Sequence, residues 1–253
     1  MSGIPTIWVK QASYENIVVE CPWCGRENIF NRASDLCTFE PIAGLDVSCQ
    51  NVECGKSFRI VGDSVNNRHE MLILDCYELL ERKHYMNCIL TLTQAYEVFF
   101  SLFLRVELLY KPFARDDGRD FNHLNRLAEM LSTKVEKYTF RPMRKLFLQQ
   151  IIANPHPANL AEAETLIAEL KAPSCKPNDA ELERLGDEEV VALLKGVKNT
   201  TIHKLRDAVV HKQAYRPTRE ETEAALEEAR SLLFPLTNRL NLYDDINWYL
   251  RRL

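Results

Sequence analysis

The pattern of apolar and polar positions along the chain changes near residue 66. Before that point, short runs of β-branched and apolar residues alternate with turn residues, which is typical of short strands. The strands expected from this pattern are 16–20, 45–48 and 57–61. Residues 64–67 look like a short linker, and after it apolar residues recur at helical spacing almost to the end of the chain. We therefore expect a small β-rich domain at 1–66 and a helical domain at 67–253.

The helical part contains one segment, Tyr85 to Tyr110, that is apolar on nearly every side. Such a segment is typical of a central helix that packs against several neighbours. The apolar face of the helix before it includes Leu72, Cys76, Leu79 and Leu80. Further helices are expected at 119–137, 141–153, 158–170, 188–211 and 219–236, with a last amphipathic segment at 239–252.

Two helix starts and one helix break can be read from the residues. Asp187 is a good N-cap for the helix that follows it. Thr218 and Glu221 fit a capping box, in which each side chain accepts a hydrogen bond from a backbone N–H that has no helical partner. Gly196 or the run 199–201 could divide the helix between 188 and 211 into two.

Composition is that of an ordinary globular protein, with 46% apolar and 27% charged residues. The net charge of −4 excludes a polyanion binder that acts through bulk charge, so any nucleic-acid contact must come from a local patch. Arg105 and Glu107 interrupt the most apolar run, Val98 to Tyr110, so we expect a buried helix and no membrane span. The first residues do not form a secretory signal. A cytoplasmic protein with reduced thiols is therefore expected.

Four of the eight cysteines form two pairs, each followed by glycine, in the pattern of a zinc ribbon. The pairs are Cys21 and Cys24, and Cys49 and Cys54. Four thiolates form a closed tetrahedral zinc site, so the predicted Zn²⁺ is structural. In so small a segment, metal binding would supply much of the folding free energy. The wider second spacing leaves open whether Cys37 replaces one ligand.

The charge of residues 1–66 does not favour phosphate binding by the ribbon. The segment carries five Lys/Arg and eight Asp/Glu, a net charge of −3. We therefore interpret the ribbon as a structural part or as a contact site for a protein partner.

A second group of candidate residues, Arg206, Asp207 and His211, lies near the end of an expected helix. Alone, an arginine and a histidine five residues apart could simply be a solvated helix end. The segment 195–219, however, contains seven basic residues and one acid, Asp207, so its net charge is +6. The segment 161–190 has a net charge of −6. A local basic patch on an acidic chain is the expected footprint of a phosphate backbone. A basic helix end explains only one or two of these charges.

Here the chain resembles the HEPN superfamily of helical ribonucleases and nucleic-acid-binding modules. That family carries Arg, a polar residue, a few further residues and then His, and Arg206, Asp207 and His211 match this motif. A Pro-Thr start to the next helix, here Pro217-Thr218, is also frequent in it. The resemblance covers roughly 70–111 and 187–236. It implies a mainly α fold, a HEPN-like bundle with a helical insertion at about 112–186, and a homodimer formed through the helical domain.

The chemistry of RNA cleavage suits these residue types. The 2′-hydroxyl needs a base with a pKa near neutral, which histidine provides, and the charged phosphorane needs a fixed cation, which arginine provides. On a helix, residues 206 and 211 point about 140° apart, so one copy cannot easily focus both on one atom unless the helix ends or bends between them. The resemblance implies that two motifs face one another across a dimer cleft. The predicted RNA-binding residues are Lys204, Lys212, Arg216 and His203; we expect His203 to lie on the surface, where it could assist binding.

The leading hypothesis is therefore a metal-independent endoribonuclease similar to HEPN toxins and antiviral (abortive infection) effectors, with Arg206, Asp207 and His211 as catalytic residues. RNA would be its substrate, and a protein partner or antitoxin could dock on the zinc ribbon. One alternative is a non-catalytic HEPN-like dimeric adaptor, which would have no need of both Arg206 and His211. The other is a zinc-ribbon DNA-binding regulator, which the acidic ribbon disfavours.

Overall fold

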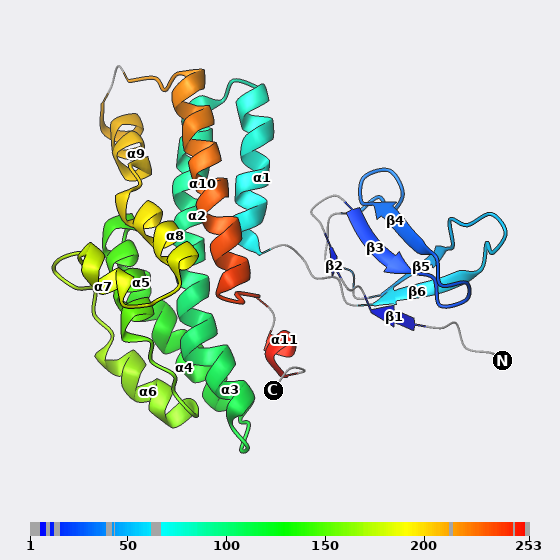
Figure 1. Ribbon diagram of the computed structural model, residues 1–253, viewed down its shortest axis with the longest axis horizontal. Coiled ribbons are helices and arrows are strands. Elements are labelled where there is room, and N and C mark those ends of the chain that lie inside the picture. The colour runs from blue at the N-terminus through cyan, green and yellow to red at the C-terminus, as the bar shows by residue number, and fades with distance from the viewer. Residues whose placement is uncertain are drawn as a thin grey trace. The chain divides into compact units, whose positions relative to one another are not determined.

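The computed structural model divides the chain into two compact units, Met1–Asn67 and Arg68–Leu253. The first unit holds the strands and the second holds the helices, so the chain is mainly α with a small N-terminal β part, as expected (Figure 1). Of the expected linker, only Asn67 belongs to the described residues. The structure describes residues 6–8, 11–12, 16–38, 42, 44–61, 67–212, 215–244 and 246–250.

The N-terminal unit contains two three-stranded sheets, with strand orders β1-β6-β5 and β2-β3-β4. The strands are β1 (Thr6–Trp8), β2 (Gln11–Ala12), β3 (Asn16–Glu20), β4 (Glu27–Asn31), β5 (Leu45–Ser48) and β6 (Ser57–Val61). The three expected strands are confirmed as β3, β5 and β6. Alternate residues of β3, β4 and β6 form the small core, among them Ile17, Phe30 and Phe58. The same core includes Cys21 and Cys49, so the expected metal ligands lie at its edge.

The second unit is a helical bundle, in which α1 and α10 lie beside α2 (Figure 1). Its first half comprises α1 (Arg68–Glu81), α2 (Tyr85–Arg105), η1 (Val106–Tyr110), α3 (Lys111–Arg115), α4 (Phe121–Val135) and α5 (Phe140–Ala153). Its second half comprises α6 (Leu160–Glu169), α7 (Asp179–Glu183), α8 (Glu188–Asn199), α9 (Ile202–His211), α10 (Arg219–Arg239) and α11 (Ile246–Leu250). Most of these helices begin within three residues of the positions expected from the pattern.

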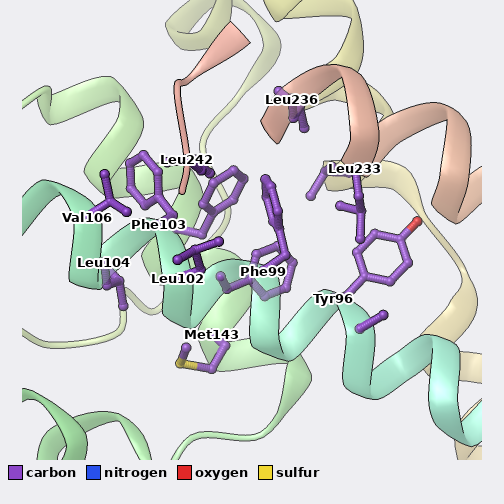
Figure 2. Close-up of a cluster of buried hydrophobic side chains, with 14 of the residues drawn as sticks. Tyr96, Phe99, Leu102, Phe103, Leu104, Val106, Met143, Leu233, Leu236 and Leu242 are labelled. Atoms are coloured by element: carbon purple, nitrogen blue, oxygen red, sulfur yellow. The ribbon is translucent and has the colours of Figure 1, made fainter. Parts of the chain in front are cut away.

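The bundle is built around α2, which is the expected central helix. Tyr96, Phe99 and Phe103 of α2 are buried among Leu233 and Leu236 of α10 and Met143 of α5 (Figure 2). The helix continues through η1 and α3 to Arg115. By length and composition this helix could cross a membrane, but 61% of its most apolar window is buried inside the bundle, as expected of a core helix.

One wide turn interrupts this long helix. In η1 the N–H of Lys111 donates to the carbonyl of Val106, five residues back, where an α-helix would use four. The next residue is Pro112, which has no N–H to donate. The wide turn therefore occurs where proline prevents the regular hydrogen-bond ladder.

The expected insertion, 112–186, is more than a surface addition. It supplies α4 to α7, and α5 packs directly on α2 with Phe140, Arg144 and Phe147 buried. The segment 239–252, in contrast, is not one helix. The helix α10 runs to Arg239, and Asn241 then adopts a left-handed conformation (φ 51°) before α11 begins.

The expected division of the helix between 188 and 211 occurs at Thr200 and Thr201, not at Gly196. Gly196 remains inside α8, where a Cβ atom would lie 2.3 Å from Leu232 Cδ2 of α10. Any larger residue at this position would force the Leu232 side chain to move, so glycine suits the close approach of α8 to α10. At Thr200 the backbone is extended (ψ 138°), so α9 starts in a new direction.

A buried hydrogen-bond network holds this corner between α8 and α9. Arg144 of α5, which is 1% exposed, donates from Nη1 to the Thr200 carbonyl at 3.0 Å. The Thr200 hydroxyl donates to Glu228 Oε2 of α10 at 2.7 Å and accepts from the backbone N–H of Ile202 at 3.3 Å. The corner is thus tied to both α5 and α10, which determines where α9 lies.

Replacing Thr200 with valine keeps the shape of the side chain but removes its hydroxyl. We expect T200V to lower the free energy of unfolding by about 1–3 kcal/mol, because Glu228 and the Ile202 N–H lose their partner in a buried place. The neighbouring Thr201 is exposed and makes no capping hydrogen bond, so T201V should change stability by less than about 0.5 kcal/mol. Urea denaturation followed by circular dichroism measures both, and equal losses would contradict the role of the corner.

Candidate functional site

The four expected zinc ligands come together at one end of the two β-hairpins of the N-terminal unit. The first pair lies between β3 and β4, and the second lies between β5 and β6. All four Sγ atoms lie within 4.8 Å of one another. Two distances, Cys21 Sγ to Cys54 Sγ and Cys24 Sγ to Cys49 Sγ, are 3.8 Å. A tetrahedral zinc with Zn–S bonds of about 2.3 Å requires sulfur–sulfur distances of about 3.8 Å. The donor set therefore fits a closed metal site.

The two knuckles share one backbone design. In the first, the Cys21 N–H donates to the Arg26 carbonyl at 2.8 Å, and in the second the Cys49 N–H donates to the Lys56 carbonyl at 3.0 Å. Gly25 and Gly55 have positive φ angles, 70° and 53°, which explains the glycine after each second cysteine.

The pKa values of two of the thiols are shifted in opposite directions. A hydrogen bond from the backbone N–H of Arg26 lowers the pKa of Cys24 to about 7. Burial raises the pKa of Cys49 to about 11, so this thiol would be protonated at neutral pH in the absence of a cation. A bound divalent metal supplies the positive charge that keeps all four sulfurs as thiolates.

Cys37 does not belong to this group. Its Sγ lies 3.9 Å from the carbonyl oxygen of Ser34, and among the described residues the group of potential ligands comprises Cys21, Cys24, Cys49 and Cys54. Despite the wider spacing of the second pair, Cys37 therefore does not replace one of the four paired cysteines.

Around the knuckles, the ribbon exposes apolar side chains. Val52 is 97% exposed, Ile29 50% and Trp23 45%. The Trp23 indole donates to the Ser57 carbonyl at 3.0 Å, and the Lys56 ammonium lies 4.9 Å from its ring centre. The nearby charges form pairs, Arg26 with Glu53 and Arg59 with Asp46. The described surface around the knuckles thus combines exposed apolar side chains with these two ion pairs.

Metal analysis of purified variants tests the zinc centre. We expect about one zinc per chain in the wild type and in C37S, and loss of zinc to a competing chelator in C54S. Stripping the metal should also make residues 16–61 sensitive to protease, because their core is small. If C37S lost as much zinc as C54S, the ligand set described above would be wrong.

The Arg–His motif lies on α9. Arg206 and Asp207 are half-buried and His211 is exposed at the last residue of the helix. Arg206 Nη1 lies 3.2 Å from Asp207 Oδ1, and Arg141 Nη2 of α5 lies 3.0 Å from Asp207 Oδ2. One carboxylate thus binds two guanidinium groups and orients both of them. Because all three side chains are partly exposed, these ion pairs add little to the stability of the fold.

The α9 helix is continuous from Arg206 to His211, with no bend between them. Five residues along an α-helix correspond to about 500° of rotation, so the two side chains point about 140° apart. A single chain therefore does not bring Arg206 and His211 to the same atom. Among the described residues, no side chain hydrogen-bonds to the His211 imidazole, and its neighbour Val210 is 47% exposed.

The expected surface position of His203 is wrong. Its ring is 9% exposed and stacks on Phe140 of α5, with ring centres 5.6 Å apart. Burial, followed by the charges of Arg144 and Arg141, lowers the pKa of His203 to about 4. The ring is therefore neutral at neutral pH and packs α9 against α5. The sequence pattern could not show this, because Phe140 is distant in sequence.

Acidic partners divide the basic residues of 195–219 into two groups. Lys195 pairs with Glu183 at 2.6 Å, Lys198 with Asp179 at 2.5 Å, and Arg219 with Glu223 at 2.7 Å. Within the described part of the chain, the remaining group has no carboxylate ion pair. Its members are Lys204, Lys212 and Arg216. Glu183 and Asp179 of the acidic segment 161–190 thus pair with the two lysines of α8, whereas no carboxylate among the described residues pairs with Lys204, Lys212 or Arg216.

Arg216 lines an open pocket of about 240 Å³ together with Lys83 and His84 from the turn between α1 and α2. Pro217 closes one side of it. Sequence reasoning passed over Lys83 and His84, although the basic run 82–84 was a visible signal.

Sequence reasoning also missed two residues in direct relation to the motif. Arg141 binds Asp207, and Glu97 of α2 lies close enough to Arg206 for that charge to act on its carboxyl group. Burial raises the pKa of Glu97, while Arg206 and the Phe140 N–H oppose the rise. Bases in the first turns of a helix are unfavourable to its macrodipole, so the run Arg141, Arg144, Lys145 was a signal.

No protein-family model, curated protein or solved structure matches this chain.

Proposed function

We propose that this protein is a metal-independent endoribonuclease of the HEPN type, acting in the cytoplasm as a toxin or antiviral defence effector on cellular RNA. One observation carries the proposal. Arg206 and His211 lie on one continuous helix, α9, and the neighbouring cations Lys204 and Lys212 have no carboxylate partner among the described residues. A surface of this charge would attract a phosphate backbone to an arginine and a histidine.

In this mechanism the exposed His211 takes the proton of the RNA 2′-hydroxyl. The 2′-oxygen forms a bond to phosphorus, and the bond from phosphorus to the 5′-oxygen breaks. The 5′-oxygen takes a proton from water, and the protonated His211 then returns its proton to the hydroxide that remains. Arg206, held by Asp207, stabilises the additional negative charge on the phosphorane. The products are a 2′,3′-cyclic phosphate and a 5′-hydroxyl.

The resemblance to the HEPN superfamily implies a homodimer, and the angle of about 140° between Arg206 and His211 in one chain supports it. Two α9 helices facing one another would place the arginine of one copy near the histidine of the other. Val210, which is exposed beside His211, is available for contact between the copies. The zinc ribbon, with its exposed Val52 and Ile29, would provide a separate surface for a protein such as an antitoxin.

Subunit complementation tests this arrangement. Homodimers of R206A and of H211A should each cleave RNA about 10²–10⁴-fold more slowly than wild type, because each removes one group from every site. A mixed dimer, co-expressed with two affinity tags, retains one Arg206 and one His211 in trans and should recover up to about half of the wild-type rate. The measurement is cleavage of a labelled total-RNA preparation by the purified dimers.

The matched control is H156A, which removes an exposed histidine outside the motif and should leave cleavage unchanged. A mixed dimer as inactive as its parents would contradict the shared site. RNA that stays intact with the wild type as well as with H211A would favour the non-catalytic adaptor.

A further inference from the structure

A group of cations outside the Arg–His motif surrounds the N-terminal half of α5. Its members are Arg141 and Lys145 of α5, Lys176 of the segment between α6 and α7, and Lys204 of α9; we call them the α5 basic cluster. They come from three separate parts of the chain, so no single run of sequence displays the cluster.

Hydrogen bonds to backbone carbonyls hold this cluster together. Lys145 Nζ donates to the Ser174 carbonyl at 2.5 Å, and Lys176 Nζ donates to the Lys198 carbonyl at 2.8 Å. Beneath them, the buried Arg144 donates to the Thr200 carbonyl. These contacts join α5, the segment after α6 and the end of α8, and they fix the ammonium groups of Lys145 and Lys176.

The cluster lacks the anions that would normally balance it. Among the described residues, Lys145, Lys176 and Lys204 form no ion pair with a carboxylate, and Asp207, the partner of Arg141, is shared with Arg206. Burial and the charges of Arg144, Lys198, Lys145 and Lys204 lower the pKa of Lys176. Several like charges thus act on one another without compensation, which favours binding of an anion from outside.

The cluster adjoins the motif. Asp207 binds Arg206 on one side and Arg141 on the other, at 3.2 and 3.0 Å, so the motif on α9 and the cations of α5 share this carboxylate and lie next to one another. A strand whose scissile phosphate lies at Arg206 could therefore continue over α5. Separated, fixed cations suit successive phosphates of a nucleic acid.

We propose that the α5 basic cluster binds the phosphodiester backbone of single-stranded RNA next to the cleaved bond. This inference rests on the proposed function for the position of the cleaved bond, but binding itself does not depend on cleavage. It assigns RNA contacts to α5 and to the segment between α6 and α7, which carry Arg141, Lys145 and Lys176.

A 2′-O-methyl RNA oligonucleotide has no free 2′-hydroxyl that could attack the phosphate. Its binding therefore measures contact with RNA independently of cleavage. The test variant is K145Q/K204Q, and the matched control is R126Q/R230Q, which removes two positive charges from surface ion pairs on α4 and α10. Fluorescence anisotropy at several salt concentrations gives Kd and its salt slope. Arg144 is left intact because it is buried in the core, and thermal melting verifies that both variants fold.

Loss of two phosphate contacts should weaken binding about tenfold or more at low salt and reduce the slope of log K against log salt by about 1.4. The control should bind like the wild type. Equal binding by K145Q/K204Q and the control would overturn the inference, even if H211A showed that the proposed cleavage is real. Weakened binding without any cleavage by the wild type would support the inference and reject the proposed function. Binding of polyglutamate through these lysines, with no binding of RNA, would also overturn the inference.

Discussion

The arrangement of the helical unit around α9 depends on one buried guanidinium group, that of Arg144. The side chain lies in the core, where its Cζ atom is 5.2 Å from the centre of the Phe140 ring. It donates a hydrogen bond to the Thr200 carbonyl at the point where α8 ends. Burial lowers the pKa of Arg144, but an arginine stays charged, so its desolvation must be offset by such contacts. Thr200 in turn binds Glu228 of α10. The direction of α9, and with it the position of Arg206, follows from this corner.

Burial and the nearby Arg144 together lower the pKa values of two neighbouring groups, His203 and Lys176. A permanent cation in the core raises the positive potential around α5, which contributes to the neutral state of His203 and to the lowered pKa of Lys176. The acidic residues of 161–190 are used elsewhere, for example Asp179 on Lys198. An acidic protein therefore carries a local cationic surface that begins at the motif and extends over α5. The N-terminal unit is compact by itself, and its four paired cysteines could hold a metal ion.

Local chemistry could be predicted from the sequence, whereas distant pairings could not. The strands at 16–20 and 57–61, the four zinc ligands and the capping box of Thr218 and Glu221 depend on residues close together in the chain or on a known ligand spacing. The sequence predicted a helix break at either Gly196 or 199–201. Which of the two is used depends on contacts with Arg144 and Leu232, which are both distant in sequence. His203 was misplaced for the same reason. Lys145, Lys176 and Lys204 are also distant in sequence, and the packing of the helices brings them together.

The central claim is that α9 carries out phosphoryl transfer with a histidine and an arginine. The most direct measurement is the chemistry of the ends produced when the purified protein cuts RNA in a buffer that contains a chelator for free Mg²⁺. The account predicts 2′,3′-cyclic phosphate and 5′-hydroxyl ends, identified by mass spectrometry, with the wild type and not with H211A. Ends that carry 3′-hydroxyl and 5′-phosphate groups, or cleavage that persists in H211A, would contradict it.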